Sequence, residues 1–154
     1  MGSLVYTAAN GFDLVELYDR MRECDRDEIE ASSGEVWPAL QQSLGLSDDP
    51  VCLRDTQGLL IAIFGVSPHS LLGDTAAPWL IGTNLMTAYG KSVLKDARRY
   101  IAFASERYPR LVNYVDARNG TSIGWLRKVG FTIDPPAPFG VAGLPFHRFH
   151  KGLD

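Results

Sequence analysis

Few of the side chains that most often carry out chemistry stand close together in this sequence. The two cysteines, Cys24 and Cys52, form no Cys-x-x-Cys or Cys-x-x-His spacing, so the sequence indicates neither a zinc site nor a disulfide framework. His147 and His150 lie near the end of the chain, and their spacing is not a metal-binding signature. We therefore predict no metal site, and two isolated thiols are typical of a reducing compartment.

Positive charge gathers on one stretch of helical periodicity, at Lys91, Lys95, Arg98 and Arg99. Such a face could attract a phosphate group or nucleic acid, although a solvated helix surface is the more ordinary interpretation. The whole chain carries a formal charge of −3 and has a pI near 5.6. This balance indicates no general attraction to nucleic acid or to an anionic membrane.

The size and composition of the chain predict one globular domain over residues 1–154. Its 154 residues are 45% hydrophobic and 21% charged, which is ordinary for a folded domain. The sequence contains no run of about 18 apolar residues, the length needed to span a membrane. Its first residues lack the pattern of a secretory signal. We therefore expect a cytoplasmic protein.

The elements that must position any site follow from the apolar periodicity. We expect strands at 4–7, 51–55, 59–66, 77–86, 111–117, 131–133 and 146–149, and helices at 12–21, 35–44, 90–107 and 119–130. The charged stretch 23–30 between the first two helices is interpreted as solvated. This order predicts an α/β (α+β) fold with helices flanking a central sheet.

One segment carries a family resemblance. Residues 111–131 consist of an apolar strand, an Asn, a small residue three positions later, and a Lys-x-Gly-Phe ending; the matching positions are Asn119, Ser122, Ile123, Lys128, Gly130 and Phe131. This pattern resembles the fifth strand and fourth helix of the GNAT N-acetyltransferase superfamily. The resemblance implies a mixed, mostly antiparallel central sheet, acetyl-CoA as cofactor and an amine as acceptor.

A narrower likeness concerns short-tailed bacteriophages. The runs Trp79-Leu-Ile-Gly-Thr-Asn, Asp116-Ala-Arg-Asn, Trp125-Leu-Arg-Lys-Val-Gly-Phe and Pro145-Phe-His-Arg-Phe resemble small GNAT-like proteins of these phages. That group is associated with virion assembly or with internal virion proteins. It implies a phage-encoded protein, located in the host cytoplasm or the virion, with virion proteins as partners.

The resemblance also implies where acetyl-CoA would bind. In the family, a Gln/Arg-x-x-Gly-x-Gly/Ala loop at a helix start holds the pyrophosphate. Here the loop has a single glycine, Gly90, and Thr87 or a neighbour stands where the Gln or Arg belongs. The expected cofactor contacts are Ile81, Thr83, Gly90, Lys91, Ser92, Asn119 and Ser122. Asn119 would cap the helix beside the cofactor cleft, and Ser122 would let that helix approach the pantetheine arm.

The catalytic positions differ from the family pattern. A family Tyr that protonates the departing thiolate is replaced by Leu126, which cannot donate a proton. Tyr89 or Tyr114 could take its place, or each could be a packing aromatic. Asp116 could accept an amine proton through water, or it could pair with Arg118 or cap the next helix.

Two functions therefore remain open at this point. One is an acetyl-CoA-dependent N-acetyltransferase with a degenerate cofactor loop, and the other is a non-catalytic GNAT-like phage protein that acts in virion assembly through protein contacts. The enzyme requires that the fourth and fifth strands separate and leave amides near 81–83 free to receive pantetheine, whereas the assembly protein does not.

Overall fold

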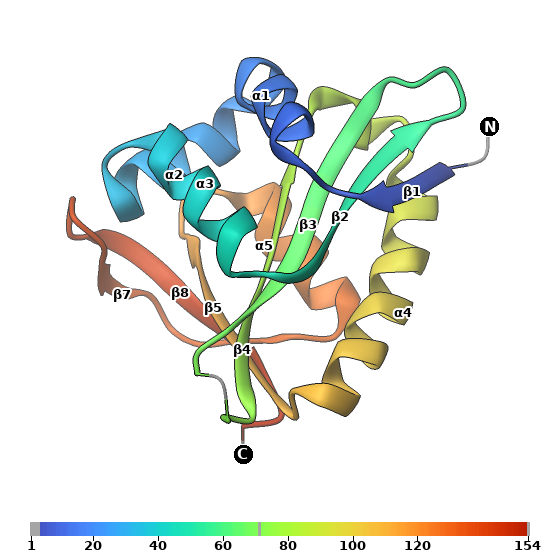
Figure 1. Ribbon diagram of the computed structural model, residues 1–154. Coiled ribbons are helices and arrows are strands. Elements are labelled where there is room, and N and C mark those ends of the chain that lie inside the picture. Colours follow the sequence, from blue (N-terminus) through green and yellow to red (C-terminus); the bar gives the residue numbers. More distant parts are fainter. Residues whose placement is uncertain (1–3, 71, 154) are drawn as a thin grey trace.

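The computed structural model describes residues 4–70 and 72–153, and these form a twisted eight-stranded sheet with helices on both faces (Figure 1). The elements in chain order are β1 (Leu4–Ala8), α1 (Gly11–Arg20), α2 (Glu23–Ser33), α3 (Val36–Leu46), β2 (Asp48–Asp55), β3 (Leu60–Pro68), β4 (Thr75–Gly82), the 3₁₀ helix η1 (Asn84–Thr87), α4 (Gly90–Arg107), β5 (Arg110–Asp116), α5 (Gly120–Val129), β6 (Thr132–Ile133), β7 (Ala137–Phe139) and β8 (Leu144–Lys151).

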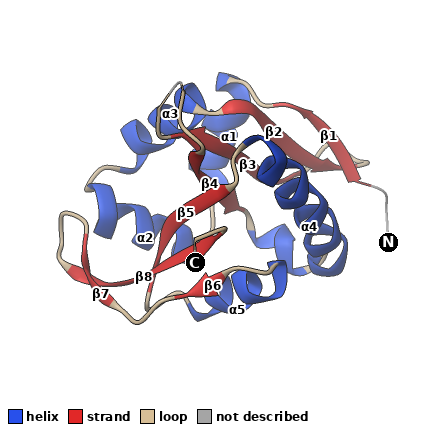
Figure 2. Ribbon diagram, turned by 90° about the horizontal axis from the view of Figure 1, so that it is seen from below, coloured by secondary structure: helices blue, strands red, loops and turns tan. Residues whose placement is uncertain are grey.

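The sheet is mostly antiparallel, which confirms the predicted fold class. Its strand order is β1-β2-β3-β4-β5-β8-β6, and β7 pairs with β8 beside this path. The central β4–β5 pair is parallel, whereas the other neighbouring pairs are antiparallel. Helices α1 to α3 cover one face, and α4 and α5 cover the other (Figure 2).

Local signals explain the helix ends. Asn10 caps α1 through a capping box with Asp13, in which each side chain accepts the other residue's backbone N–H. Asn119 caps α5 by accepting from the Ser122 amide, and Gly130 ends that helix in the left-handed conformation at a φ of 118°. The helix expected at 90–107 is present with the same bounds.

Three apolar clusters of described residues hold the layers together, and the two larger ones lie under the two layers of helices. Under α1 to α3, the first includes Leu14, Leu17, Leu40, Cys52 and Ile63. Under α4 and α5, the second includes Ala76, Ile101, Leu111, Val115 and Phe149. Burial of each large aliphatic or aromatic side chain in these clusters contributes roughly 1.5–3 kcal/mol, so both faces of the sheet are firmly covered.

The structure corrects three details of the expected element order. The charged stretch interpreted as solvated is the helix α2, strand β4 ends at Gly82 rather than at Met86, and β7 is an additional strand. Thr83 ends β4 because its side chain accepts from the Leu85 amide and starts η1. Apolar periodicity did not predict helix α2, because two carboxylates, Asp25 and Glu28, occupy positions that face the sheet. None of the described helices is long and apolar enough to cross a membrane.

Candidate functional site

Strands β4 and β5 separate after a short parallel contact. Their pairing consists of Thr75 with Arg110 and Ala76 with Leu111, although both strands continue for several more residues. The facing backbone groups beyond Ala76 and Leu111 therefore lack a neighbouring strand. A gap in the middle of a sheet leaves polar groups that need other partners, because unpaired buried N–H and C=O groups are costly.

Asn113 of β5 bridges the gap near its closed end. Its side-chain Nδ2 donates to the Pro78 carbonyl of β4 at 2.9 Å, and its Oδ1 accepts from the Tyr114 amide at 2.9 Å. The side chain thus replaces one rung of the missing ladder. Proline is tolerated at position 78 because the backbone nitrogen of this residue faces the gap and not β3.

At the open end of the gap, two carboxylates of α2 accept hydrogen bonds from backbone amides, one on β4 and one on β5. Asp25 Oδ2 accepts from the Gly82 amide of β4 at 2.9 Å. Glu28 Oε1 accepts from the Asp116 amide of β5 at 2.9 Å and from Asn119 Nδ2 at 3.3 Å. Residues three apart lie on one helix face, so a single helix reaches both strands.

Leu80 presents its backbone to the gap between these two bridges. Backbone groups alternate along a strand, and the neighbours Pro78 and Gly82 both direct polar groups away from β3. The Thr83 amide, by contrast, donates to the Ile61 carbonyl of β3. By the same alternation the N–H and C=O of Leu80 point into the gap and those of Ile81 point toward β3.

A cavity of about 740 Å³ extends through this gap to both faces of the sheet. On one face it is lined from α2, α3 and β7, and on the other from α4, α5 and η1. The volume is within the usual range of small-molecule sites, about 300–1,000 Å³. The sheet is therefore open to a ligand that contacts both layers of helices.

The two carboxylates differ in their electrostatics. Burial raises the pKa of Glu28 from 4.5 to about 7, and the Asp116 amide offsets only part of this effect. Burial also raises the pKa of Asp25, but the Arg22 guanidinium beside it opposes the rise. Arg22 and Asp25 form an ion pair at 2.9 Å. Glu28 consequently holds or releases a proton near neutral pH.

The predicted phosphate loop begins helix α4. Tyr89 at the N-cap makes no side-chain cap bond, and the first intrahelical bond is from the Val93 amide to the Tyr89 carbonyl. The amides of Gly90, Lys91 and Ser92 are therefore the first-turn donors that an anion could accept from. Gly90 lines the cavity, and a Cβ placed there would meet nothing within 4 Å.

The α5 side of the cavity combines small residues with one indole. Gly120, Ser122 and Gly124 line it, whereas Asn119 is buried behind them as the cap of α5. Trp125 also lines the cavity, and its buried Nε1 has no acceptor among the described residues. A buried indole N–H without a partner favours a ligand that carries an acceptor. The residues present thus fit a pantetheine arm, which carries amide carbonyls.

The expected cofactor residues are only partly brought together. Gly90 and Ser122 line the cavity, and the side chain of Ile81 does so too, although its amide points toward β3. The amide of Thr83 is not free as expected, because both its amide and its hydroxyl donate to carbonyls of β3. The gap-facing amide is that of Leu80, one residue before the expected run.

Asp116 is one of three candidate catalytic residues, and the structure ties it to Arg118. Its carboxylate is buried and accepts bonds from the Arg118 guanidinium and amide, with the closest ion-pair distance 2.7 Å. Burial works to raise the pKa of Asp116, but the bonds from Arg118 outweigh it and lower the pKa.

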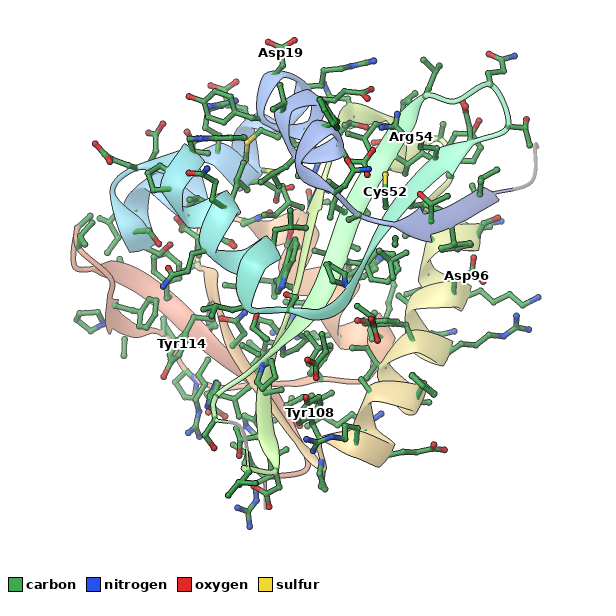
Figure 3. All side chains as sticks on the ribbon, viewed as in Figure 1. Asp19, Cys52, Arg54, Asp96, Tyr108 and Tyr114 are labelled. Carbon is green, nitrogen blue, oxygen red and sulfur yellow. The ribbon has the colours of Figure 1, made fainter. Side chains whose placement is uncertain are left out.

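Of the two tyrosines, only Tyr114 lies in the cavity. It projects from β5 (Figure 3). Its ring stacks on that of Phe139 of β7, with the ring centroids 3.9 Å apart. Tyr89 lies outside the cavity lining and donates to Asp55 Oδ2 at 3.2 Å. Leu126 is buried against the cluster under α4 and α5.

Glu28 and Asp25 were missed by the sequence interpretation. Their signal was the three-residue spacing of Arg22, Asp25 and Glu28, which places all three on one helix face. That signal is visible only when the charged stretch is interpreted as a helix.

Comparison with solved structures identifies the architecture. The spermidine N-acetyltransferase of Vibrio cholerae, in complex with CoA and spermine, matches with a TM-score of 0.68 at 14% identity over 96% of this chain and 94% of that one. A GCN5-related N-acetyltransferase from Kribbella flavida matches with a TM-score of 0.68 at 16% identity over 97% and 98%. The fold is that of the GNAT N-acetyltransferases. No sequence-family model and no curated protein sequence matches the chain.

Proposed function

We propose that the protein is a GNAT-type N-acyltransferase that transfers the acetyl group of acetyl-CoA to an amine. One observation carries the proposal: the cavity passes between β4 and β5 at the level where Leu80 turns its backbone into the gap. An acyl thioester needs such an amide, because its carbonyl oxygen gains negative charge during transfer.

The two sides of the cavity suit the two reactants. On the α4–α5 side, Gly90, Ser122 and Trp125 would hold the phosphates and pantetheine of CoA through the first-turn amides of α4 and the free indole N–H. On the α2 side, Glu28 would face the amine. The structurally similar V. cholerae enzyme was solved with CoA and spermine, a carrier of acyl groups and an amine, which supports this pair of reactants.

The thiolate must be protonated by a group other than the tyrosine that the family resemblance implies. Leu126 is apolar and buried, so it supplies no proton. Tyr6, Tyr100 and Tyr114 are the phenols that line the cavity, and we propose Tyr114, which lies on a strand bordering the gap, or solvent as the donor.

Calorimetric titration with acetyl-CoA tests the proposal. We expect saturable binding to one site, and we expect Gly90→Glu to weaken it at least about tenfold, because the new carboxylate would repel the pyrophosphate at close range. The substitution is tolerated structurally, since Gly90 has open space around it and an acidic residue suits a helix N-terminus.

Gly45→Glu is the matched control. Gly45 lies in α3, also has nothing within 4 Å of an added Cβ, and is absent from the cavity lining. It adds the same charge and should leave the affinity unchanged. No binding at millimolar acetyl-CoA, or equal affinity for both variants, would contradict the proposal.

The alternative is a phage protein of virion assembly that acts through protein contacts. It is favoured by the buried Leu126 and by the sequence likeness described above. This alternative predicts no binding of acetyl-CoA, so the same titration separates the two functions.

A further inference from the structure

We propose that Glu28 is the general base of the acceptor site, and that the acceptor is a primary amine with one positive charge on an aromatic or aliphatic body. This inference rests on the proposed acetyltransferase function and specifies its second substrate.

The two oxygens of Glu28 have different surroundings. Oε1 is fixed by the Asp116 amide and by Asn119 Nδ2. No described residue donates a hydrogen bond to Oε2, although Glu28 lines the cavity. A carboxylate that is oriented through one oxygen and free at the other is suited to accept a proton from a bound ligand.

Glu28 is also the carboxylate in this part of the cavity that lacks a cation. Asp25 is paired with Arg22, and Asp116 is paired with Arg118. Burial, together with the negative charges of Asp25 and Asp116, raises the pKa of Glu28 to about 7. A protonated amine entering the cavity would supply the missing positive charge.

Apart from the Arg22–Asp25 ion pair and Asn113, the rest of this wall is mainly apolar and aromatic. Beside Glu28, the cavity is lined on this face by Ile29, Leu40, Trp79, Tyr114 and Phe139, and serines of α2 and α3 add hydroxyls. Trp79 is held by a bond from its Nε1 to Ser47 Oγ at 2.7 Å. Such a wall buries a hydrocarbon or aryl body, but a polyamine would leave its further ammonium groups without carboxylates.

The reaction balances with Glu28 as the proton acceptor. The ammonium group gives one proton to Oε2, and the neutral nitrogen attacks the carbonyl carbon of the acyl thioester. A C–N bond forms, the C–S bond breaks, and the sulfur leaves as a thiolate. Tyr114 or solvent protonates the thiolate, the second proton lost by the nitrogen restores that donor, and Glu28 returns its proton to solvent.

The test measures acetylation rates for 2-phenylethylamine, hexylamine and spermidine against pH, in the wild-type protein and in Glu28→Gln. We expect kcat/KM for 2-phenylethylamine or hexylamine to exceed that for spermidine at least tenfold. We expect Glu28→Gln to lower kcat by about 10²–10⁴-fold and to remove the limb of the pH profile near 7. Glu30→Gln, an exposed residue on the same helix, is the matched control and should behave as wild type.

Acetyl-CoA affinity separates this inference from the proposed function. If the wild-type protein does not bind acetyl-CoA, both fall together. If it binds, and Glu28→Gln binds equally well but keeps the wild-type rate and pH profile, Glu28 is not the base. If it binds, but spermidine is the better acceptor or neither monoamine is acetylated, the acceptor class is wrong.

Discussion

Replacement of Glu28 by Gln should change how the stability of the protein depends on pH. The pKa of Glu28 is about 7 in the folded protein, against an ordinary value of 4.5. The folded state therefore binds this proton more tightly than the unfolded state. The stability that the protonated carboxyl contributes is complete below about pH 4.5 and is lost as the pH rises through 7. Gln keeps the oxygen that accepts from the Asp116 amide but does not titrate.

The size of the effect follows from the pKa change. A rise from 4.5 to about 7 corresponds to about 3 kcal/mol at 1.36 kcal/mol per pKa unit. Because Glu28 lines an open cavity, solvent screening reduces this to about 1–3 kcal/mol. For a domain of this size, the melting temperature of Glu28→Gln relative to wild type should rise by about 3–10 °C between pH 4.5 and 8.

Scanning calorimetry across this pH range measures the difference. Glu30→Gln on the exposed side of α2 corrects for the loss of one negative charge from the helix. A constant difference in melting temperature between Glu28→Gln and wild type at every pH would refute the reasoning, since it would mean that Glu28 titrates alike in both states.

Two further substitutions test how the gap and α2 are held. Asn113→Ala removes the bridge across the gap and leaves one carbonyl and one amide unpaired, so we expect a loss of about 1–3 kcal/mol in urea denaturation, and a loss below 0.5 kcal/mol would contradict the bridge. Gly140→Ala should lower the free energy of unfolding more than Gly143→Ala does in the same assay. Both glycines have a positive φ, but only a Cβ at position 140 would lie 2.6 Å from the backbone of Ser32. Equal losses of stability would show that this contact does not restrict the residue at position 140.

The parts of the fold that could be predicted are those with local signals. Helix α4 has a long apolar period and a proline after its end, and its predicted bounds agree with the structure. Asn119 and Gly130 are the cap residues that the Asn and Gly of the sequence pattern indicate. The fold class followed from these elements and from the family resemblance of the segment around α5.

The candidate site was harder to predict because it depends on contacts between distant segments. Asn113 is an ordinary polar residue in a strand, and its bridging role exists only because β5 diverges from β4. Glu28 belongs to a stretch so rich in charge that solvation was the natural interpretation. Its environment arises from the amide of Asp116, which lies 88 residues further along the chain.

Nuclear magnetic resonance of the Leu80 amide tests the central claim most directly. In protein labelled with ¹⁵N-leucine, the Leu80 cross-peak can be assigned with Leu80→Ile and followed during titration with acetyl-CoA. We predict a saturable shift of Leu80, because its N–H faces the gap, with little change at the exposed Leu46 of α3. A Leu80 cross-peak that stays in place while acetyl-CoA saturates the protein would contradict a thioester site between β4 and β5.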